Sequence, residues 1–270
     1  MLDRVIALDW NRQKVHIEVQ WVGRQELQSD NRHPLIIFLH EGLGSVSAWG
    51  DFPERLCRQL NIAGLAYSRP GYGQSTPRAA DEHWQPDYLH RQAKEVLPLV
   101  LEASGVDLKS RSVFLLGHSD GASIALIHAA MSPTQLSGIV LMAPHIFVED
   151  VTIDGVERAR EAYLTTRLRE RLSRHHRDPD SAFWGWNRIW LDPRFRSWSI
   201  AHEIGAITCP VFAMQGLQDE YATMAQLHGI AQRLPQTRLL EIAECGHAPH
   251  RDQPDMVCAA IQDFILSIDQ

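Results

Sequence analysis

The sequence contains no apolar run long enough to cross a bilayer, so we expect no transmembrane helix and no membrane partner. A charged pair, Asp3 and Arg4, stands near the N-terminus and is followed by a strand-like run, not by the long apolar core of a signal peptide. The cysteines are few and scattered, and they show no CxxC spacing: Cys57, Cys209, Cys245 and Cys258. We therefore expect a reduced, cytoplasmic protein without a disulfide framework or structural zinc.

Excess positive charge is also missing. There are 26 lysine and arginine residues against 33 aspartate and glutamate residues, and the formal net charge is -7. Nucleic acids and anionic membranes attract basic surfaces, so neither is expected as a partner. The segment Gly71-Tyr72-Gly73 lacks the third glycine and the helix of a dinucleotide site, and we expect no cofactor. The sequence leaves a homodimer open.

Histidine is abundant, with 14 residues, but it shows no clear metal-binding pattern. His175 and His176 lie between two arginines and are interpreted as a solvated, charged turn. Carboxylate partners at ligand spacing are not evident around them, so we expect no metal site.

Strand-like runs recur along the chain, and helical patterns lie between the later ones. The 270 residues are 44% hydrophobic, which suits one large domain with a full core. The later runs are almost continuously apolar, as in parallel strands covered on both faces, whereas the first two alternate, as in an antiparallel edge hairpin. The pattern predicts an α/β fold with a mostly parallel, doubly wound sheet of eight strands. The runs are 4–8, 14–22, 35–40, 62–67, 112–116, 136–142, 211–215 and 238–242.

One segment, residues 145–205, contains no strand-like run. A helical insertion between the sixth and seventh strands would lie over the carboxyl edge of the sheet. We therefore interpret 145–205 as a helical lid on an α/β core formed by 1–144 and 206–270. Tryptophans concentrate in the lid, where they would either contact a ligand or anchor the helices to the core. The candidate ligand contacts are His145, Trp184, Trp186 and Trp190.

Residues 117–121 read Gly-His-Ser-Asp-Gly and follow the apolar run 113–116. The residues after them, 122–127, have a helical and apolar character, so Ser119 lies on a tight turn from a strand into a helix. Such a turn raises the serine hydroxyl above the sheet edge, and flanking glycines keep the turn uncrowded. The motif predicts that Ser119 is a catalytic nucleophile.

Two downstream positions offer the groups that a serine nucleophile needs. Asp219 follows the run 211–215 at the same sheet edge, with Glu220 as its neighbouring rival, although an aspartate there could also cap a helix. His247 lies on a glycine-flanked loop after the last strand, with His250 as the competitor. An imidazole must take up the hydroxyl proton, and a carboxylate must orient that imidazole. We therefore predict a triad of Ser119, Asp219 and His247.

An acyl-transfer intermediate also carries an anionic oxygen, which requires hydrogen-bond donors. The backbone amide of Asp120, at the start of a helix, is one candidate. The loop after the third strand reads His40-Glu41-Gly42-Leu43-Gly44 and offers a second donor. We favour the amide of Gly42, with that of Leu43 as the alternative.

The motifs, in the chain order serine, aspartate, histidine, resemble those of the α/β-hydrolase superfamily. The resemblance covers essentially the whole chain and includes the segment Ser-Arg-Pro-Gly-Tyr-Gly-Gln-Ser at 68–75. That family usually has glycine where this chain has Glu41. The Gly-x-Ser-Asp-Gly form is similar to the branch of biphenyl-hydrolase-like, valacyclovir-hydrolase-type esterases. The resemblance implies that the Asp120 side chain binds the α-amino group of an amino-acid ester, although an aspartate at a helix start also suits the helix dipole.

The leading prediction is a serine hydrolase that cleaves a small-molecule ester, with carboxylesterase as the default activity. Hydrolysis of amino-acid esters or peptides is an alternative, and it would use Asp120 for the amine. Cleavage of a carbon–carbon bond in a dienoate acid is another, and Arg188 or Arg194 could then supply the cation for the carboxylate. The non-enzymatic alternative is a small-molecule receptor that retains the triad. The fold alone does not separate these functions.

Overall fold

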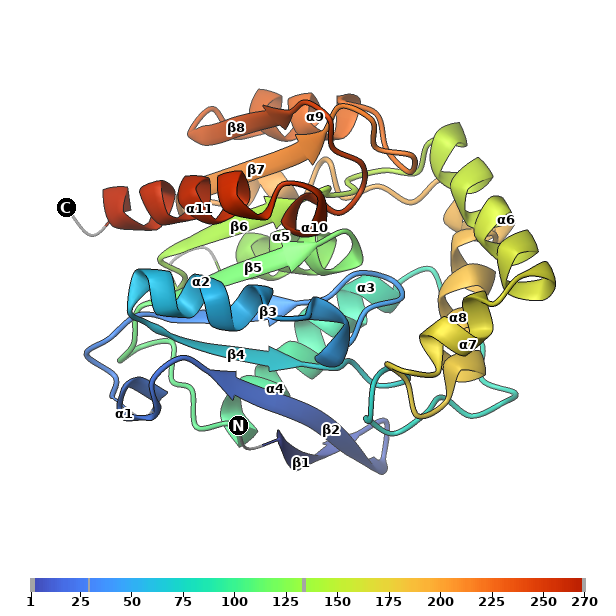
Figure 1. The fold of residues 1–270 in the computed structure, drawn as a ribbon, viewed down its shortest axis with the longest axis horizontal. Helices are drawn as coiled ribbons and strands as arrows, with labels where there is room; N and C mark the ends of the chain where they lie inside the picture. The colour runs from blue at the N-terminus through green and yellow to red at the C-terminus, as the bar shows by residue number, and fades with distance from the viewer. Residues whose placement is uncertain (1–2, 29, 133–134, 269–270) are drawn as a thin grey trace.

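The computed structural model describes residues 3–28, 30–132 and 135–268. In this part of the chain, eight strands form one sheet in the order β1-β2-β4-β3-β5-β6-β7-β8 (Figure 1). Of these strands only β2 runs in the opposite direction to the rest, so the predicted mostly parallel sheet is confirmed. Each predicted strand run overlaps a strand. The strands are β1 (Asp3–Trp10), β2 (Gln13–Val22), β3 (Leu35–Leu39), β4 (Ala63–Tyr67), β5 (Val113–His118), β6 (Gly138–Met142), β7 (Val211–Gly216) and β8 (Thr237–Ile242).

The first two strands form the predicted hairpin at one edge of the sheet. Asn11 and Arg12 connect them with positive φ angles of +54° and +60°, which is the two-residue turn that matches the twist of a hairpin. The central strands β3 to β7 are buried at every residue, as their continuous apolar sequences predict.

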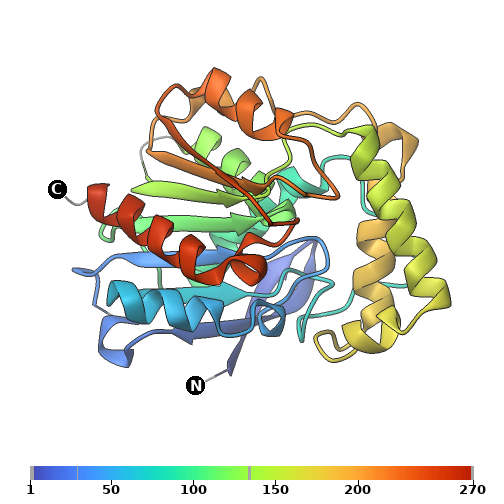
Figure 2. The same ribbon diagram turned by 45° about the horizontal axis from the view of Figure 1, so that its top comes forward.

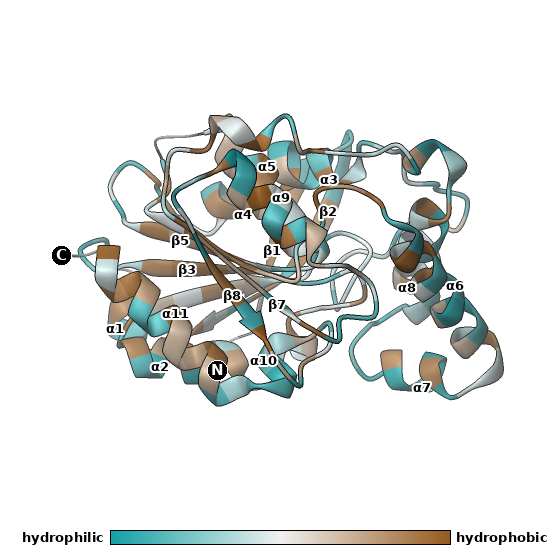
Figure 3. Ribbon diagram, turned by 90° about the horizontal axis from the view of Figure 1, so that it is seen from above, coloured by the Kyte–Doolittle hydropathy of each residue, from teal (hydrophilic) through white to brown (hydrophobic). Residues whose placement is uncertain are grey.

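Helices cover both faces of the sheet (Figures 1 and 3). One face packs against α2 (Phe52–Leu60) and α11 (Pro254–Ile268), the latter preceded by the short α10 (Pro249–Asp252). The other face packs against α3 (Tyr88–Arg91), the π-helical turn η2 (Gln92–Val96), α4 (Leu97–Ala103), α5 (Asp120–Met131) and α9 (Ala225–Arg233). The remaining short elements in the core are α1 (Gln25–Gln28), η1 (Ser47–Trp49) and η4 (Ile204–Ala206). None of the helices in the described ranges is both long and apolar enough to cross a membrane.

A third group of helices lies beyond the carboxyl ends of the parallel strands (Figure 2). It follows β6 in the chain and consists of α6 (Asp150–Thr165), α7 (Leu168–Leu172) and α8 (Pro179–Trp190), with the turn η3 (Pro193–Phe195) after them. These helices fall within the segment 145–205 that the sequence marked as free of strands. They lie beyond the sheet edge at which β5 ends and α5 begins.

Candidate active site

Ser119 lies on the turn between β5 and α5, with its backbone at φ +52° and ψ −116°. A positive φ is unusual for a residue with a side chain and marks a strained turn. Close packing holds it, because a Cβ on Gly117 would overlap the backbone of Gly121, and one on Gly121 would overlap that of Leu39. The Ser119 amide also donates to the Met142 carbonyl at 2.9 Å. The hydroxyl is therefore fixed at the carboxyl edge of the sheet.

The imidazole of His247 stands between Ser119 and Asp219. Its Nε2 is 3.0 Å from the Ser119 hydroxyl oxygen, and its Nδ1 is 2.8 Å and 3.0 Å from the two Asp219 carboxylate oxygens. Because an ionised carboxylate only accepts hydrogen bonds, Nδ1 carries a proton and donates it to Asp219. Nε2 is then left to accept the hydrogen bond of the serine hydroxyl. The fold thus aligns His247 with Ser119, which is 128 positions away in the sequence, and with Asp219, which is 28 positions away.

The surroundings of these three side chains favour an ionised Asp219 and a basic His247. Burial by itself would lower the pKa of His247, but the charge and hydrogen bond of Asp219, helped by the charge of Glu220, raise it above its ordinary value. Burial would raise the pKa of Asp219, whereas His247 and the Tyr221 amide hold it below its ordinary value. The Asp219 carboxylate can therefore stabilise the imidazolium that forms when His247 takes up a proton.

The two rival residues have other contacts. Glu220 accepts the backbone amide of His247 through Oε2 at 3.2 Å, so it contacts the loop rather than the ring. His250 is buried, with its ring centre 5.0 Å from that of Trp49. The imidazole of His247 therefore contacts Asp219 and not Glu220.

Three backbone amides near Ser119 have the freedom that an oxyanion site requires. Gly42 and Leu43 line the same cavity as Ser119, and Asp120 follows the serine directly. None of the three amides donates to an acceptor within the described residues. A Cβ on Gly42 would overlap the indole of Trp186, so glycine is the residue that fits there. The three amides are available to donate to a ligand oxygen.

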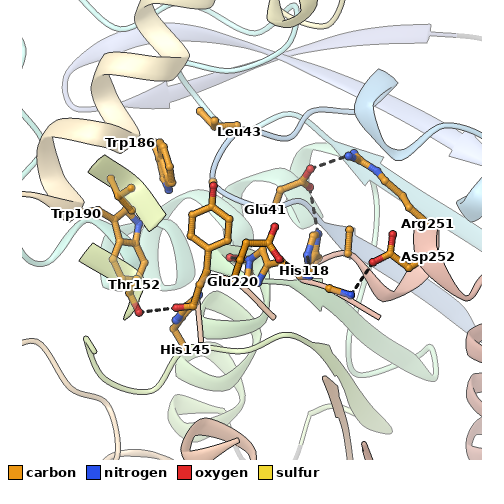
Figure 4. A pocket seen from close by; sticks show the side chains of 17 residues that line it. Glu41, Leu43, His118, His145, Thr152, Trp186, Trp190, Glu220, Arg251 and Asp252 are labelled. Carbon is orange, nitrogen blue, oxygen red and sulfur yellow. Dashed lines mark hydrogen bonds and ion pairs between the residues drawn. The ribbon is translucent and has the colours of Figure 1, made fainter. Parts of the chain in front are cut away.

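A cavity of about 360 Å³ opens at Ser119, and Figure 4 shows that its two sides differ in chemistry. The aromatic side carries rings and small apolar groups from α6, α8 and nearby loops: His145, Thr152, Val156, Trp186, Trp190 and Tyr221. The charged side carries Glu41, His118, Arg251 and Asp252, and the carboxylate of Glu220 lies between the two sides. Among the described lining residues, three side chains thus carry a carboxylate and one carries a guanidinium.

The predicted ligand contacts divide into two groups. Three of them line the cavity: His145, Trp186 and Trp190. For Trp184 the prediction is wrong, because its ring packs edge-on against Tyr163 at 5.6 Å and does not line the cavity. Sequence reasoning missed six lining residues that belong to no motif and reach the cavity only through the packing of their elements: Thr152, Val156, Tyr221, Ala248, Arg251 and Asp252.

The proposed cation site for a substrate carboxylate is also wrong. Arg188 lies over the ring of Trp184, with 5.6 Å between the guanidinium carbon and the ring centre. Arg194 pairs with Asp192 at 2.7 Å on the surface. Neither lines the cavity, and its one described cationic lining residue, Arg251, already contacts a carboxylate of the same wall.

The carboxylate of Asp120 is fully buried and does not line the cavity. Its Oδ2 lies 3.3 Å from both terminal nitrogens of Arg69 and accepts from the Tyr88 hydroxyl at 3.1 Å. Its Oδ1 accepts from the indole nitrogen of Trp190 at 3.2 Å. The role implied by the resemblance, binding of a substrate amine, has no support in this arrangement, because the carboxylate is paired with Arg69 and does not face the cavity. Sequence reasoning missed the pair because its members are 51 positions apart and no local pattern joins them.

The histidine doublet is not a solvated turn throughout. His176 is buried, its Nδ1 accepts from the Gly73 amide at 2.9 Å, and its Nε2 donates to the Leu43 carbonyl at 3.0 Å. The segment after α7 is thereby connected to the loop that carries Gly42 and Leu43. Within the described ranges, no group of three or more histidine, cysteine, aspartate or glutamate side chains is arranged to hold a metal ion.

Comparisons with known proteins relate this site to others. The model of the alpha/beta hydrolase family matches residues 36–260. Serine hydrolase BPHL of Mus musculus is 26% identical over 266 residues, which cover 93% of this chain and 83% of that protein. A thermophilic esterase from Thermogutta terrifontis superposes with a TM-score of 0.72 at 16% identity over 100% of both chains. Proline iminopeptidase from Mycobacterium smegmatis superposes with a TM-score of 0.68 at 18% identity over 99% of both chains. Because an esterase and a peptidase share this fold, the similarity of fold does not select a substrate.

Proposed function

Because this chain belongs to the alpha/beta hydrolase family and is a hydrolase, we propose that it cleaves a small carboxylic ester with Ser119 as the nucleophile. The observation that carries the proposal is the line from Ser119 through His247 to Asp219, with contacts of 3.0 Å and 2.8 Å. A serine hydroxyl is a weak nucleophile at neutral pH and needs such a base. The likeness to serine hydrolase BPHL supports the same type of reaction.

The first half of the reaction forms an acyl-enzyme. His247 Nε2 takes the hydroxyl proton while the Ser119 oxygen bonds to the ester carbonyl carbon, and the carbonyl electron pair moves onto its oxygen. The amide of Asp120, together with that of Gly42 or Leu43, donates to this oxyanion. The bond to the leaving oxygen then breaks, and the imidazolium delivers its proton to the departing alcohol.

The second half of the reaction releases the acid. A water molecule gives a proton to His247 and attacks the acyl carbon, and the same amides bind the second oxyanion. The bond to the Ser119 oxygen breaks, and the imidazolium returns the proton to the serine. The buried Asp219 carboxylate stays ionised throughout and keeps the ring in the required tautomer.

The cavity supports a small and uncharged acyl group. Its volume of about 360 Å³ is near the lower end of the range for ligand sites. Indole rings of Trp186 and Trp190 form the aromatic side, which suits a short aliphatic or aromatic acyl chain. The imidazole of His145 joins them, and burial lowers its pKa to about 3, so it contributes a neutral polar group.

We also propose that residues 145–205 act as the lid of this site. Within the segment, Thr152, Val156, Trp186 and Trp190 contribute to the cavity wall, so the segment forms one side of the cavity. Trp190 is anchored to the core by its hydrogen bond to Asp120. A lid of this kind would exclude water from the acylation step.

The charges of the cavity argue against a substrate that carries a carboxylate. A dienoate acid would bring a carboxylate to a wall in which Glu41, Glu220 and Asp252 outnumber Arg251. The substrate carboxylate would be repelled by these carboxylates, and the repulsion is strong where the charges are partly buried. An amino-acid ester would find the Asp120 carboxylate already bound by its internal partner. A neutral ester avoids the repulsion and does not depend on Asp120.

The test is hydrolysis of short p-nitrophenyl esters by the Ser119→Ala variant. We expect kcat to fall by on the order of 10⁴-fold or more, because the bond-forming atom is gone. The fold should persist, because the hydroxyl replaced is small, and a matching thermal unfolding curve checks this. A receptor that only binds esters would show no turnover in the natural chain either, and substantial turnover by the variant would contradict the assignment of Ser119.

A further inference from the structure

The loop that carries His247 has no regular secondary structure of its own, and three side chains brace it. The Gly246 amide donates to Asp252 Oδ2 at 2.8 Å, and the His247 amide donates to Glu220 Oε2 at 3.2 Å. The His247 carbonyl accepts from Nε2 of His118 at 2.7 Å. Asp252 and Glu220 are exposed, whereas His118 is buried. Of the three contacts, the one between His118 and the His247 carbonyl is therefore shielded from water.

The two nitrogens of the His118 ring have different partners. A carbonyl oxygen only accepts, so Nε2 of His118 carries a hydrogen. Its Nδ1 faces Glu41 Oε2 at 3.5 Å, and the other oxygen of Glu41 lies 3.3 Å from Nη2 of Arg251 (Figure 4). Glu41 thus lies on the side of the ring away from the His247 loop. At this position the alpha/beta hydrolase family usually has glycine.

The ring of His118 is enclosed on its other sides. The ring centres of His250 and His247 lie 5.0 Å and 5.3 Å from its own, and that of Trp49 lies 6.3 Å away. Burial alone would raise the pKa of Glu41, but the neighbouring His118, with Arg251 and His250, holds it well below its ordinary value. An ionised carboxylate therefore lies on the Nδ1 side of the ring, and because it only accepts hydrogen bonds, it orients the ring through an N–H at Nδ1 while the N–H at Nε2 points at the carbonyl.

From these contacts we infer that His118 is a positioning residue for His247 and that Glu41 orients it. The inference rests on the proposed function, because it concerns the base of the proposed triad. His118 immediately precedes Ser119 at the end of β5, so one strand end carries both the nucleophile and the group that holds the loop of the base. This arrangement sets the 3.0 Å contact between the hydroxyl and the imidazole. His118 itself exchanges no proton with the substrate.

Two replacements of His118 separate positioning from a merely structural role. A glutamine amide nitrogen reaches the position of the imidazole Nε2, whereas an asparagine amide reaches only that of Nδ1. His118→Asn should therefore lose the contact with the His247 carbonyl, and His118→Gln should retain a donor there. With p-nitrophenyl acetate, we expect kcat to fall by roughly 10- to 100-fold in His118→Asn, with little change in KM, because small misplacement of a reacting group has effects of this size. His118→Gln should recover most of the loss.

The exposed pair of His228 and Glu241 offers a matched control, since its contact of 2.8 Å lies outside the cavity. His228→Asn should leave kcat unchanged. The rate at which a fluorophosphonate labels Ser119 gives a second readout, because it also requires His247 as the base. It should fall in parallel with kcat in His118→Asn and stay unchanged in His228→Asn.

Glu41→Gln keeps the size of the side chain and removes its charge, and it serves if His118→Asn does not fold. We expect it to lower kcat in the same direction, and we expect the double variant with His118→Asn to be no slower than the slower single variant. The inference would be overturned if the natural chain and His118→Asn had equal kcat and equal labelling rates. It would also be overturned if kcat fell equally in His118→Asn and His118→Gln. A catalytically active Ser119→Ala variant would instead overturn the proposed function, so the two failures are distinguishable.

Discussion

The buried pair of Asp120 and Arg69 offers a direct test of how this site differs from the amine-binding role that the resemblance implies. Replacing Asp120 with asparagine keeps the size of the side chain but leaves the Arg69 guanidinium buried without its carboxylate. The exposed fractions are 0% and 1%, so water does not replace the lost partner. Breaking a buried ion pair by removing one partner costs roughly 3–5 kcal/mol.

The loss can be measured as a shift in thermal unfolding. For chains of this size class, 1 kcal/mol corresponds to a Tm shift of roughly 2–4 °C, so we expect Asp120→Asn to lower Tm by about 6–20 °C. Asp192→Asn is the matched control, because Asp192 also pairs with an arginine but does so at the surface. Exposed pairs contribute little, so the control should shift Tm by no more than about 2–4 °C. A Tm unchanged in Asp120→Asn would refute the reasoning.

The same variant tests the specificity of the site. Two p-nitrophenyl esters, of butyric acid and of 2-aminobutyric acid, differ only in the amino group. Because Asp120 does not line the cavity, Asp120→Asn should change kcat/KM for both esters by similar factors, measured below the Tm of the variant. If kcat/KM fell selectively for the amino ester by about tenfold or more, the loss would match that of one polar contact. It would show that the carboxylate reaches the substrate.

Two further predictions concern the base and the cavity wall. Asp219 raises the pKa of His247, which must be neutral to accept the serine proton, so kcat/KM should rise with pH through a midpoint above about 6.5. Asp219→Asn should move this midpoint to lower pH and lower kcat by on the order of 10⁴-fold; an unmoved midpoint in a pH–rate profile would contradict the assignment. Trp186→Ala should raise KM for butyrate relative to acetate esters, whereas Trp184→Ala should not, and equal effects of both variants in steady-state kinetics would contradict the described cavity wall.

The framework of the fold was predictable because its signals are local. Continuous apolar runs mark buried parallel strands, and alternating runs mark the edge hairpin, so the strands could be recognised one by one. Residues that follow the carboxyl ends of parallel strands meet at one edge of a sheet. For that reason Ser119, Asp219 and His247 could be predicted to approach one another although nothing in the sequence measures the distances between them.

The cavity wall was harder to predict, because it depends on which face of a helix turns inward. Trp186 and Trp190 are four residues apart in α8 and share a face, whereas Trp184 is two residues, about 200°, away from Trp186. Helical periodicity could therefore have separated Trp184 from the other two. It could not have told which of the faces contacts the cavity, since that follows from how α8 docks on the core.

The polar contacts within the core had no signal in the sequence. Arg69 was part of a motif but could not be assigned to Asp120, because the pairing arises only when the end of β4 meets the start of α5. His176 lies among arginines and was expected in solvent, yet the backbone of two distant loops supplies both of its hydrogen bonds. Buried polar side chains of this kind become visible only when their partners are known.

The most direct test of the account is to identify the atom that a substrate-like reagent modifies. The natural chain is treated with a fluorophosphonate, digested, and its peptides are weighed by mass spectrometry, beside the Ser119→Ala and His247→Ala variants. We expect one adduct, on Ser119, formed quickly in the natural chain, slowly without His247, and absent when Ser119 is replaced. An ester-hydrolysing chain that carries no adduct at Ser119, or that is labelled equally well without His247, would contradict it.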